Sequence, residues 1–429
     1  MSRKMKDSGI EWIGEIPEEW SINKVGFFYN IVLGKMVNNH NQKDTDYYLC
    51  AANIKWNGVD TSIQKRMYFS DEEKAVYLLS DGDVLIMEGG LAGTACIYNG
   101  EFAPCFIQNS VHRCRARTGS INKYLYYWMY VVVYSGYINS ICNKATIMHY
   151  TKEKLNSTPI IVTTLSEQIA IATYLDRQCT HIDNIIEKTK ISIEEYKKLK
   201  QAVITQAVTK GIRGNREMKD SGIDWIGEIP VEWEVRRIKN LFTLRDERNN
   251  LPLSEVNLIS LYTDLGVVQH SDLEKTSGNK ASNADGYKLV YENDIVVNII
   301  LCWMGAIGRS EYNGVTSPAY DVYIPSNNVE CRYYHHYFRT SGFSGDCYKR
   351  GRGIMAMRWR TYSDQFRDIS VLYPPLLEQK EVLSYLDQKC TEIDAIITKK
   401  QQFLTEMESY KKSLIFECVT GKREVFQKL

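Results

Sequence analysis

Two stretches of the chain carry apolar residues at alternating steps of three and four, which is the spacing of one helix face. The first apolar stripe includes Leu175, Ile182, Ile186 and Ile193. The second stripe includes Leu386, Ile393, Ile397 and Leu404. Neither stretch contains Pro or Gly before Gly211 and Gly421, and Glu, Lys, Gln and Thr fill the other positions. The pattern is typical of a coiled-coil seam and predicts two helices, each with a length of roughly 60 Å.

A helix with a single apolar stripe needs a partner to cover it, and the simplest partner is the other helix. Two stripes of equal length fit an antiparallel pair, so we predict an antiparallel coiled coil. The alternative is that each helix packs only on its own domain. Lys200 and Lys411 interrupt the two stripes at equivalent positions. Either these lysines set the register of the helix pair, or their aliphatic side chains extend along the stripe so that the ammonium groups reach water.

The segments ahead of the two helices, residues 21–162 and 234–373, mix short apolar runs with turn residues. In the first, VLIMEGG, TACIYNG and TPIIV read as strands, and 121–139 reads as a buried helix. In the second, NLISLYTDLG, DIVVNIIL, AIGRSEYNG and YDVYIP read as strands, and CRYYHHYFRTSGF reads as a helix. Each segment is therefore predicted to be a domain of mixed α/β (α+β) class.

The sequence contains an internal duplication. The segment MKDSGIEWIGEIPEEW from Met5 to Trp20 returns as MKDSGIDWIGEIPVEW from Met218 to Trp233, with 14 of 16 positions identical. The segment EQIAIATYLD at Glu167 returns as EQKEVLSYLD at Glu378. The segments between these landmarks have nearly equal lengths but largely unrelated sequences. Similar landmark motifs around dissimilar intervening segments indicate one fold used for two specificities. The alternative is a tandem duplication whose halves diverged without a functional reason.

The repeat gives an internal pseudo-two-fold organisation in six parts. They are an opening motif at 1–20, a first body at 21–162, a central helix at 163–212, a second opening motif at 213–233, a second body at 234–373 and a C-terminal helix at 374–429.

The overall charge is almost balanced, with 53 Lys and Arg against 52 Asp and Glu. Any affinity for nucleic acid must therefore come from local basic patches or from a partner. The candidate DNA-binding residues cluster late in each body. They are Arg113, Arg115, Arg117 and Lys144 in the first body, and Lys349, Arg350, Arg352, Arg358 and Arg360 in the second. We expect the second cluster to form a loop, because Gly and aromatic residues are interleaved with the arginines. A guanidinium group can reach phosphates and can also pair with guanine.

The chain lacks the usual signatures of catalysis. No GxxxxGK[ST] loop for ATP is present, and Tyr373-Pro-Pro-Leu departs from the amino-methyltransferase motif that it superficially resembles. Cys331 with His335 and His336 offers no fourth metal ligand. Asp83 and Asp294 begin strand-like runs, where roles in turns are commoner than catalysis. We therefore predict no catalytic centre and no metal site.

The eleven cysteines are odd in number and never spaced as CxxC, which favours reduced, mostly buried thiols. The N-terminus has no apolar segment of the signal-peptide type, and no uncharged apolar stretch is long enough to span a membrane. These features predict a cytoplasmic protein without membrane contact.

The opening DSGxxWxGxIPxxW, at Asp7 and again at Asp220, and the EQ…LD segments that begin both helices resemble the specificity subunit of type I restriction–modification enzymes. A further match is the GxxSPAYxVY-like stretch at Gly314–Tyr323, for which the first body has Ala103-Pro-Cys-Phe instead. The resemblance covers the whole chain.

The resemblance implies a non-catalytic subunit whose two target-recognition domains each read one half of a split site in double-stranded DNA. The helix pair then acts as a spacer and as a docking surface for two methyltransferase subunits, and restriction/translocase subunits complete the complex. S-adenosylmethionine, ATP and Mg are expected on those partners, with no cofactor on this chain.

Two other classes compete with this interpretation. A free-standing DNA-binding regulator would bind its site tightly without an enzyme partner. A coiled-coil scaffold protein would have no affinity for DNA, which the arginine-rich segment argues against.

Overall fold

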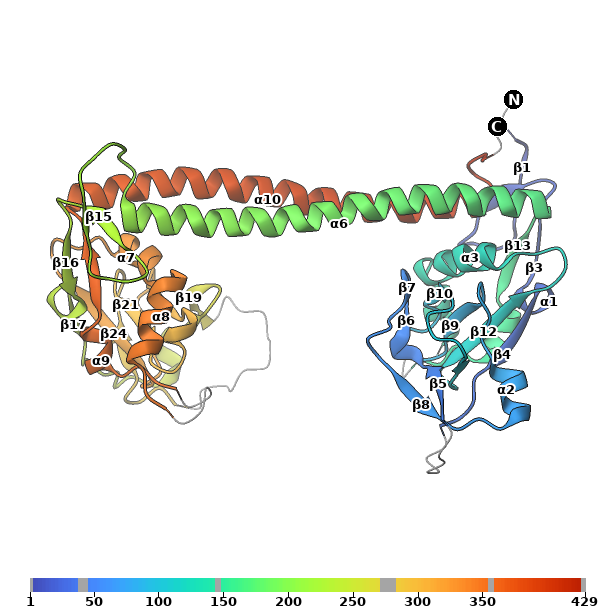
Figure 1. Cartoon of the computed structure of the whole chain (residues 1–429), viewed down its shortest axis with the longest axis horizontal. Coiled ribbons are helices and arrows are strands. Elements are labelled where there is room, and N and C mark those ends of the chain that lie inside the picture. The colour runs from blue at the N-terminus through green and yellow to red at the C-terminus, as the bar shows by residue number, and fades with distance from the viewer. Residues whose placement is uncertain (1–2, 38–44, 143–147, 271–282, 354–358, 426–429) are drawn as a thin grey trace. The chain divides into compact units, whose positions relative to one another are not determined.

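The computed structural model describes residues 3–37, 45–142, 148–270, 283–353 and 359–425 (Figure 1). The chain divides into two compact units. Unit 1 comprises residues 1–190 and 402–429, and unit 2 comprises residues 191–401. Each unit therefore contains one body together with a part of both long helices, so the helices do not form separate domains.

Unit 1 contains thirteen described strands and the shorter helices around them. The strands are β1 (Met5–Asp7), β2 (Glu15–Pro17), β3 (Ser21–Lys24), β4 (Tyr29–Leu33), β5 (Asp46–Leu49), β6 (Ile54–Lys55), β7 (Gly58–Val59), β8 (Lys65–Met67), β9 (Val84–Met87), β10 (Ala95–Ile97), β11 (Cys105–Ile107), β12 (Val111–Ala116) and β13 (Pro159–Val162). The helices are α1 (Val25–Phe28), η1 (Ala51–Asn53), α2 (Asp71–Tyr77), α3 (Asn122–Tyr134), α4 (Tyr137–Ile141) and α5 (Lys152–Ser157), followed by α6 (Leu165–Lys210), which continues into unit 2.

Unit 2 begins and ends with the same kinds of elements as unit 1, but the strands between β17 and β21 differ from those between β4 and β9. The described strands are β14 (Met218–Asp220), β15 (Glu228–Pro230), β16 (Glu234–Arg237), β17 (Phe242–Leu244), β18 (Ile259–Tyr262), β19 (Gly266–Gln269), β20 (Lys288–Val290), β21 (Ile295–Asn298), β22 (Ile307–Arg309), β23 (Gly314–Thr316), β24 (Tyr320–Pro325) and β25 (Ser370–Tyr373). The helices are η2 (Ile238–Asn240), η3 (Leu253–Glu255), η5 (Cys302–Met304), α7 (Cys331–Phe338), α8 (Ser341–Arg350) and α9 (Ser363–Arg367), followed by α10 (Leu376–Val419), which ends in unit 1.

A four-stranded antiparallel sheet forms the centre of each body. Its order is β10-β9-β12-β4 in unit 1 and β22-β21-β24-β17 in unit 2, so equivalent strands occupy equivalent places. The middle strands β9 and β21 are buried along their whole length because both of their faces are covered. The predicted mixed α/β bodies are confirmed, and they share the topology of the central sheet despite their unrelated sequences.

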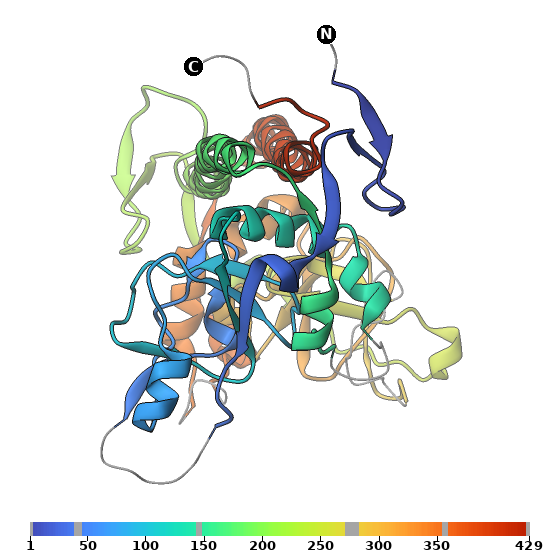
Figure 2. The same ribbon diagram turned by 90° about the vertical axis from the view of Figure 1, so that its right-hand side faces the viewer.

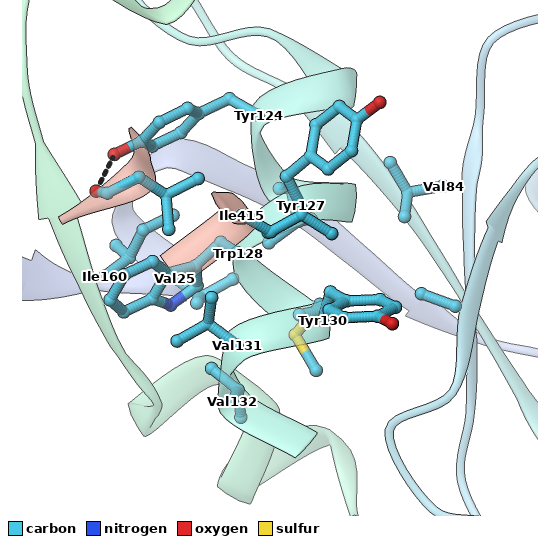
Figure 3. Packing of buried hydrophobic residues seen from close by; sticks show 14 of the residues in the cluster. Val25, Val84, Tyr124, Tyr127, Trp128, Tyr130, Val131, Val132, Ile160 and Ile415 are labelled. Carbon is cyan, nitrogen blue, oxygen red and sulfur yellow. Dashed lines mark hydrogen bonds between the residues drawn. The ribbon is translucent and has the colours of Figure 1, made fainter. Parts of the chain in front are cut away.

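The aromatic helix of the first body packs against this sheet. Figure 3 shows Tyr124, Trp128 and Val131 of α3 in the same cluster as Ile415 of α10. The indole N–H of Trp128 donates to the carbonyl of Pro159 at 2.7 Å, which satisfies its one polar atom inside the core. The sequence pattern predicts a single helix over 121–139, but the structure has two. Gly136 separates α3 from α4 with a φ of 79°, a left-handed conformation that favours glycine.

Within each unit, the α6 and α10 segments lie side by side and antiparallel (Figures 1 and 2). In unit 1, Asp183 meets Lys411, and the α10 end at Gly421 lies against Trp20, whose indole binds Glu167 near the start of α6. In unit 2, Lys200 meets Asp394. The predicted seam is largely buried. Leu175, Ile182, Ile186, Ile193, Leu386, Ile393 and Ile397 are buried, and Leu404 is partly buried.

Candidate nucleic-acid interface

The first copy of the opening motif contacts the N-terminal end of helix α6. The guanidinium of Arg3 lies 2.6 Å from one carboxylate oxygen of Glu167, and the indole N–H of Trp20 donates to the other at 3.1 Å. Burial raises the pKa of Glu167, but hydrogen bonds from Thr163, Arg3 and Trp20 outweigh it, so the net pKa is lowered. The carboxylate therefore stays charged and clamps the opening motif to the helix.

The same clamp recurs in unit 2. Trp233 donates its indole N–H to Glu378 at 2.8 Å, and Arg216 forms an ion pair with the same carboxylate. These three residues stand at the repeat positions of Trp20, Glu167 and Arg3. The repeated motifs therefore encode one Arg–Glu–Trp contact that attaches each body to a long helix. We call this contact the mount.

The remaining polar residues of the EQ…LD segment also bind the body of their own unit. Gln168 accepts a hydrogen bond from the backbone of Ile121 at 3.3 Å, and Gln379 accepts one from Glu330 at 2.9 Å. Asp176 accepts the hydroxyl proton of Tyr127 on α3 at 2.7 Å. Its counterpart Asp387 binds Arg332 on α7 at 2.6 Å. Each of these side chains is engaged within its own unit and helps to hold the body on its long helix.

Two arginines of the first-body cluster predicted to bind DNA are engaged within the body, where both donate to the carbonyl of Leu78. Arg113 lies on β12 with 5% of its surface exposed, and its guanidinium donates to the carbonyls of Val76 and Leu78 at 2.8 Å. Its burial contradicts the prediction that it contacts DNA. Burial also lowers the pKa of Arg113.

Arg115 also has a structural partner, because it forms two hydrogen bonds with the carboxylate of Asp83, at 2.6 and 2.8 Å. Arg117 is exposed just beyond β12, and its side chain has no hydrogen-bond or ion-pair partner among the described residues. Lys144 lies outside the described residues. Of this cluster, only Arg117 is left as a described candidate for contact with DNA.

Asp83 and Asp294 have the turn roles expected of them. Asp83 accepts from the backbone N–H of Ser80, and Asp294 accepts from that of Tyr291, each at 2.8 Å. Each also binds an arginine. The arginine is Arg115 in unit 1 but Arg245, from the neighbourhood of a different strand, in unit 2. The two bodies thus satisfy the same buried carboxylate with unrelated residues.

The second-body cluster divides into two parts. Lys349 and Arg350 are the last residues of α8, which corrects the prediction that they belong to a loop. Lys349 lies 3.7 Å from Asp224 of the opening motif, and both basic groups act on the carboxyl of Asp346. Their charge is therefore partly balanced by acidic neighbours.

Arg352 and Arg360 form the other part of the cluster. Their backbones are joined by two hydrogen bonds, of 2.8 and 3.0 Å, in an antiparallel bridge. Neither guanidinium has an acidic partner among the residues that the structure describes. Arg358, between them, lies outside the described residues.

A cluster of three aromatic side chains supports this bridge. Trp359 stacks on Tyr348 with ring centroids 4.8 Å apart and donates its indole N–H to the carbonyl of that residue. Trp303 of η5 packs against the same tyrosine at 5.6 Å. Tyr348 and Trp359 are the aromatic residues interleaved with the arginines in the sequence, whereas Trp303 comes from a distant segment and was not predicted to join them.

Equivalent positions can be read from the strand registers. In unit 1 Met87 faces Val111, and in unit 2 Asn298 faces Tyr320, at the same ends of the two sheets. Ser317–Tyr320 of the SPAY stretch therefore corresponds to 108–111. The sequence comparison had matched it with Ala103–Phe106, which was wrong because the intervening loops differ in length.

Cys331 and the neighbouring histidines form no metal centre. Among residues in the described ranges, no group of three or more His, Cys, Asp or Glu side chains is placed to hold a metal ion. His335 instead accepts a hydrogen bond from the backbone N–H of Arg309 at 3.1 Å. Likewise, no helix in the described ranges is long and apolar enough to cross a membrane.

The chain is similar to known proteins over nearly its whole length. It is 25% identical over 96% of both chains to a putative type I restriction enzyme MjaX specificity subunit of Methanocaldococcus jannaschii. It is 24% identical to the MjaVIII specificity subunit of the same organism, over 54% of this chain and 51% of the relative.

Two solved structures share the fold. A chain from a study of complex assembly and conformational transition of the type I R-M system superimposes with a TM-score of 0.70 at 11% identity, covering 95% of this chain and 99% of that one. The HsdS subunit from Thermoanaerobacter tengcongensis gives 0.51 at 14% identity, over 95% and 98%.

The model of the type I restriction modification DNA specificity domain matches the chain twice, at 17–195 and at 230–406. These two matches coincide with the two mounted bodies and their helices. The chain therefore belongs to the family of type I restriction–modification specificity subunits, and its role is DNA recognition.

Proposed function

We propose that each body reads one half of a two-part DNA site. The observation that carries this proposal is that both units have the same central sheet and the same Arg–Glu–Trp mount, whereas their equivalent surfaces carry different residues. At the place of Arg360 in unit 2, unit 1 has His149, whose ring lies 3.0 Å from Glu88. A shared mount with different reading groups is the arrangement expected for two half-sites of different sequence.

The helix pair serves in this proposal as a ruler. Helices α6 and α10 have 46 and 44 residues, which corresponds to roughly 65 to 70 Å of continuous helix. The two half-sites must have a constant separation, because each has to present the correct side of the duplex to its body. We expect a fixed, unread gap between them.

The partners in this proposal are two copies of a methyltransferase subunit, docked on the helix pair. In unit 1, the partly exposed Ile185 lies at the level of Tyr410, of which 47% is exposed. In unit 2, the repeat counterparts Leu199 and Ile396 are 48% and 36% exposed. One apolar pair that occurs in both units fits one kind of partner bound twice.

The chemistry belongs to other subunits. The methyltransferase copies would bind S-adenosylmethionine, and restriction/translocase subunits would supply ATP- and Mg-dependent cleavage. All eleven cysteines of this chain are free, as expected for a protein that works on DNA in the cytoplasm.

The test is co-expression with the cognate methyltransferase subunit, followed by single-molecule mapping of methylated bases in the DNA of the host. We expect a motif of two short half-sites with a constant gap. Deleting one heptad from both helices, residues 188–194 and 399–405, should change the gap and leave both half-sites unchanged. A continuous motif, or specific binding by the chain alone without new methylation, would refute the proposal.

A further inference from the structure

Arg352 and Arg360 are directly opposite each other in an antiparallel bridge. Because each backbone N–H donates to the other residue's carbonyl, they form a hydrogen-bonded pair. Side chains of such a pair leave the ladder on the same face, with Cβ atoms roughly 5 Å apart. Two guanidinium groups therefore start from neighbouring points and extend to the same side.

This like-charge pair is unfavourable for the isolated chain. Cross-strand pairs of equal charge destabilise a ladder, and no acidic group among the described residues neutralises either arginine. Lys349 and Arg350, by contrast, have Asp224 and Asp346 as neighbours. An unbalanced pair of this kind is consistent with a ligand that supplies the missing acceptors.

The backbone that carries the pair is held from three sides. Thr361 donates its N–H to the carbonyl of Ile299 at 2.9 Å and its hydroxyl proton to that of Cys347 at 2.9 Å. The Trp359 ring packs on Tyr348, and it lies so close to Gly351 that a Cβ there would clash with the indole at 2.3 Å. The two arginines therefore project from a fixed frame.

We propose that Arg352 and Arg360 read guanine bases in the major groove of the half-site bound by unit 2. This inference rests on the proposed function. A planar guanidinium pairs with O6 and N7 of guanine through two hydrogen bonds, and a fixed frame suits selection of a base edge better than contact with a phosphate. Two neighbouring arginines can serve guanines at neighbouring base-pair steps.

The inference is restricted to one half-site. The counterpart of Arg360 in unit 1 is His149, because Tyr150 N–H donates to the carbonyl of Glu88 as Thr361 N–H does to Ile299. The His149 ring is paired with the Glu88 carboxylate and offers no guanidinium fork. Guanine contacts of this kind are therefore expected on the unit 2 side only.

The decisive variants are Arg352→Lys and Arg360→Lys, because lysine keeps the positive charge but loses the paired donors of the guanidinium. The full chain is co-expressed with its methyltransferase subunit, and methylated sites are mapped. Binding of the complex is then measured on duplexes that carry the mapped motif or single base changes, at several salt concentrations. The matched control is Arg236→Lys, a partly exposed arginine on β16 that packs over Tyr373.

We expect each variant to reduce the preference for guanine at one position of one half-site, by roughly tenfold to a hundredfold, with the other half-site unchanged. The control should retain the motif. A motif without guanine in either half-site would overturn the inference, as would lysine variants with unchanged discrimination. If alanine variants instead weaken binding equally on all sequences and reduce its salt dependence, the arginines contact phosphates. A wild-type chain without a two-part motif would instead refute the proposed function itself.

Discussion

Lys411 of α10 binds Asp183 of α6, with its ammonium nitrogen 2.7 Å from both carboxylate oxygens. The repeat places the same pair in unit 2, where Lys200 lies 2.6 Å from Asp394. The two lysines are the residues that interrupt the apolar stripes. The interruption is thus an interhelical ion pair formed twice, once in each unit, with the same antiparallel register.

We predict that these ion pairs select the register of the helix pair. Asp183→Lys should destabilise the full chain, because it places two like charges in contact. Adding Lys411→Asp should restore most of the loss. The coupling energy in a double-mutant cycle should be about 0.5 kcal/mol, as for partly exposed pairs. Urea unfolding measures the free energies of the cycle. The same charge exchange in the Glu194–Lys197 pair, which lies within one helix, serves as the control. Losses that simply add would contradict the prediction.

We predict a much larger effect at the mount of unit 2. Glu378→Gln leaves the guanidinium of Arg216 charged and enclosed, with 12% of its side chain exposed. Removing one partner of a buried pair costs roughly 3 kcal/mol or more. The matched control is Glu381→Gln, whose partner Arg213 is half exposed, and there we expect less than about 1 kcal/mol. Equal effects of the two variants in thermal unfolding would show that the clamp is not a major source of stability.

Unit 2 should lose stability in mild acid through His335. Burial lowers the pKa of this ring to about 3, and His336, Arg339, Arg309 and Arg332 add to the effect. Because the pKa in the folded state lies below that in the unfolded state, the contribution is complete above about pH 6.5 and is lost as the pH falls toward 3.

At pH 5 this loss should be roughly 2 kcal/mol for this single group. His335→Asn keeps an acceptor for the N–H of Arg309 but does not titrate, so its stability should vary less between pH 7 and 5. Denaturant unfolding at the two pH values measures the difference. An unchanged pH dependence in the variant would show that the ring is already protonated, or not the titrating group.

Arg113 should contribute to stability and have no effect on specificity. Arg113→Ala removes the donor to the carbonyl of Val76 and one of the two donors to the carbonyl of Leu78, the other being Arg115, which costs about 1 to 3 kcal/mol. The methylated motif should remain the same at a temperature where the variant is folded. Arg117→Ala, at an exposed position, serves as the control and should leave the melting temperature unchanged. A changed methylation motif for Arg113→Ala would show that this residue takes part in DNA recognition.

The sequence by itself determined the helices, the repeat and the fold class. Heptad spacing is a local property, so Leu175 and Leu386 identify their helices without knowledge of any distant contact. The repeated Glu167 and Glu378 identified the frame, because both perform the same mounting task. The break at Gly136 escaped prediction because glycine is tolerated inside a helical pattern and only its backbone angle reveals the turn.

Only the tertiary structure decided which arginines are available to DNA. In the sequence, Arg113 and Arg352 are equivalent members of basic clusters. In the fold, the first is enclosed beside two carbonyls and the second faces another arginine across a bridge. The physical reason is that the availability of a charge depends on its neighbours in space, and those neighbours come from distant segments such as Val76 or Arg360. Periodicity specifies which elements form, whereas packing specifies which side chains are already engaged.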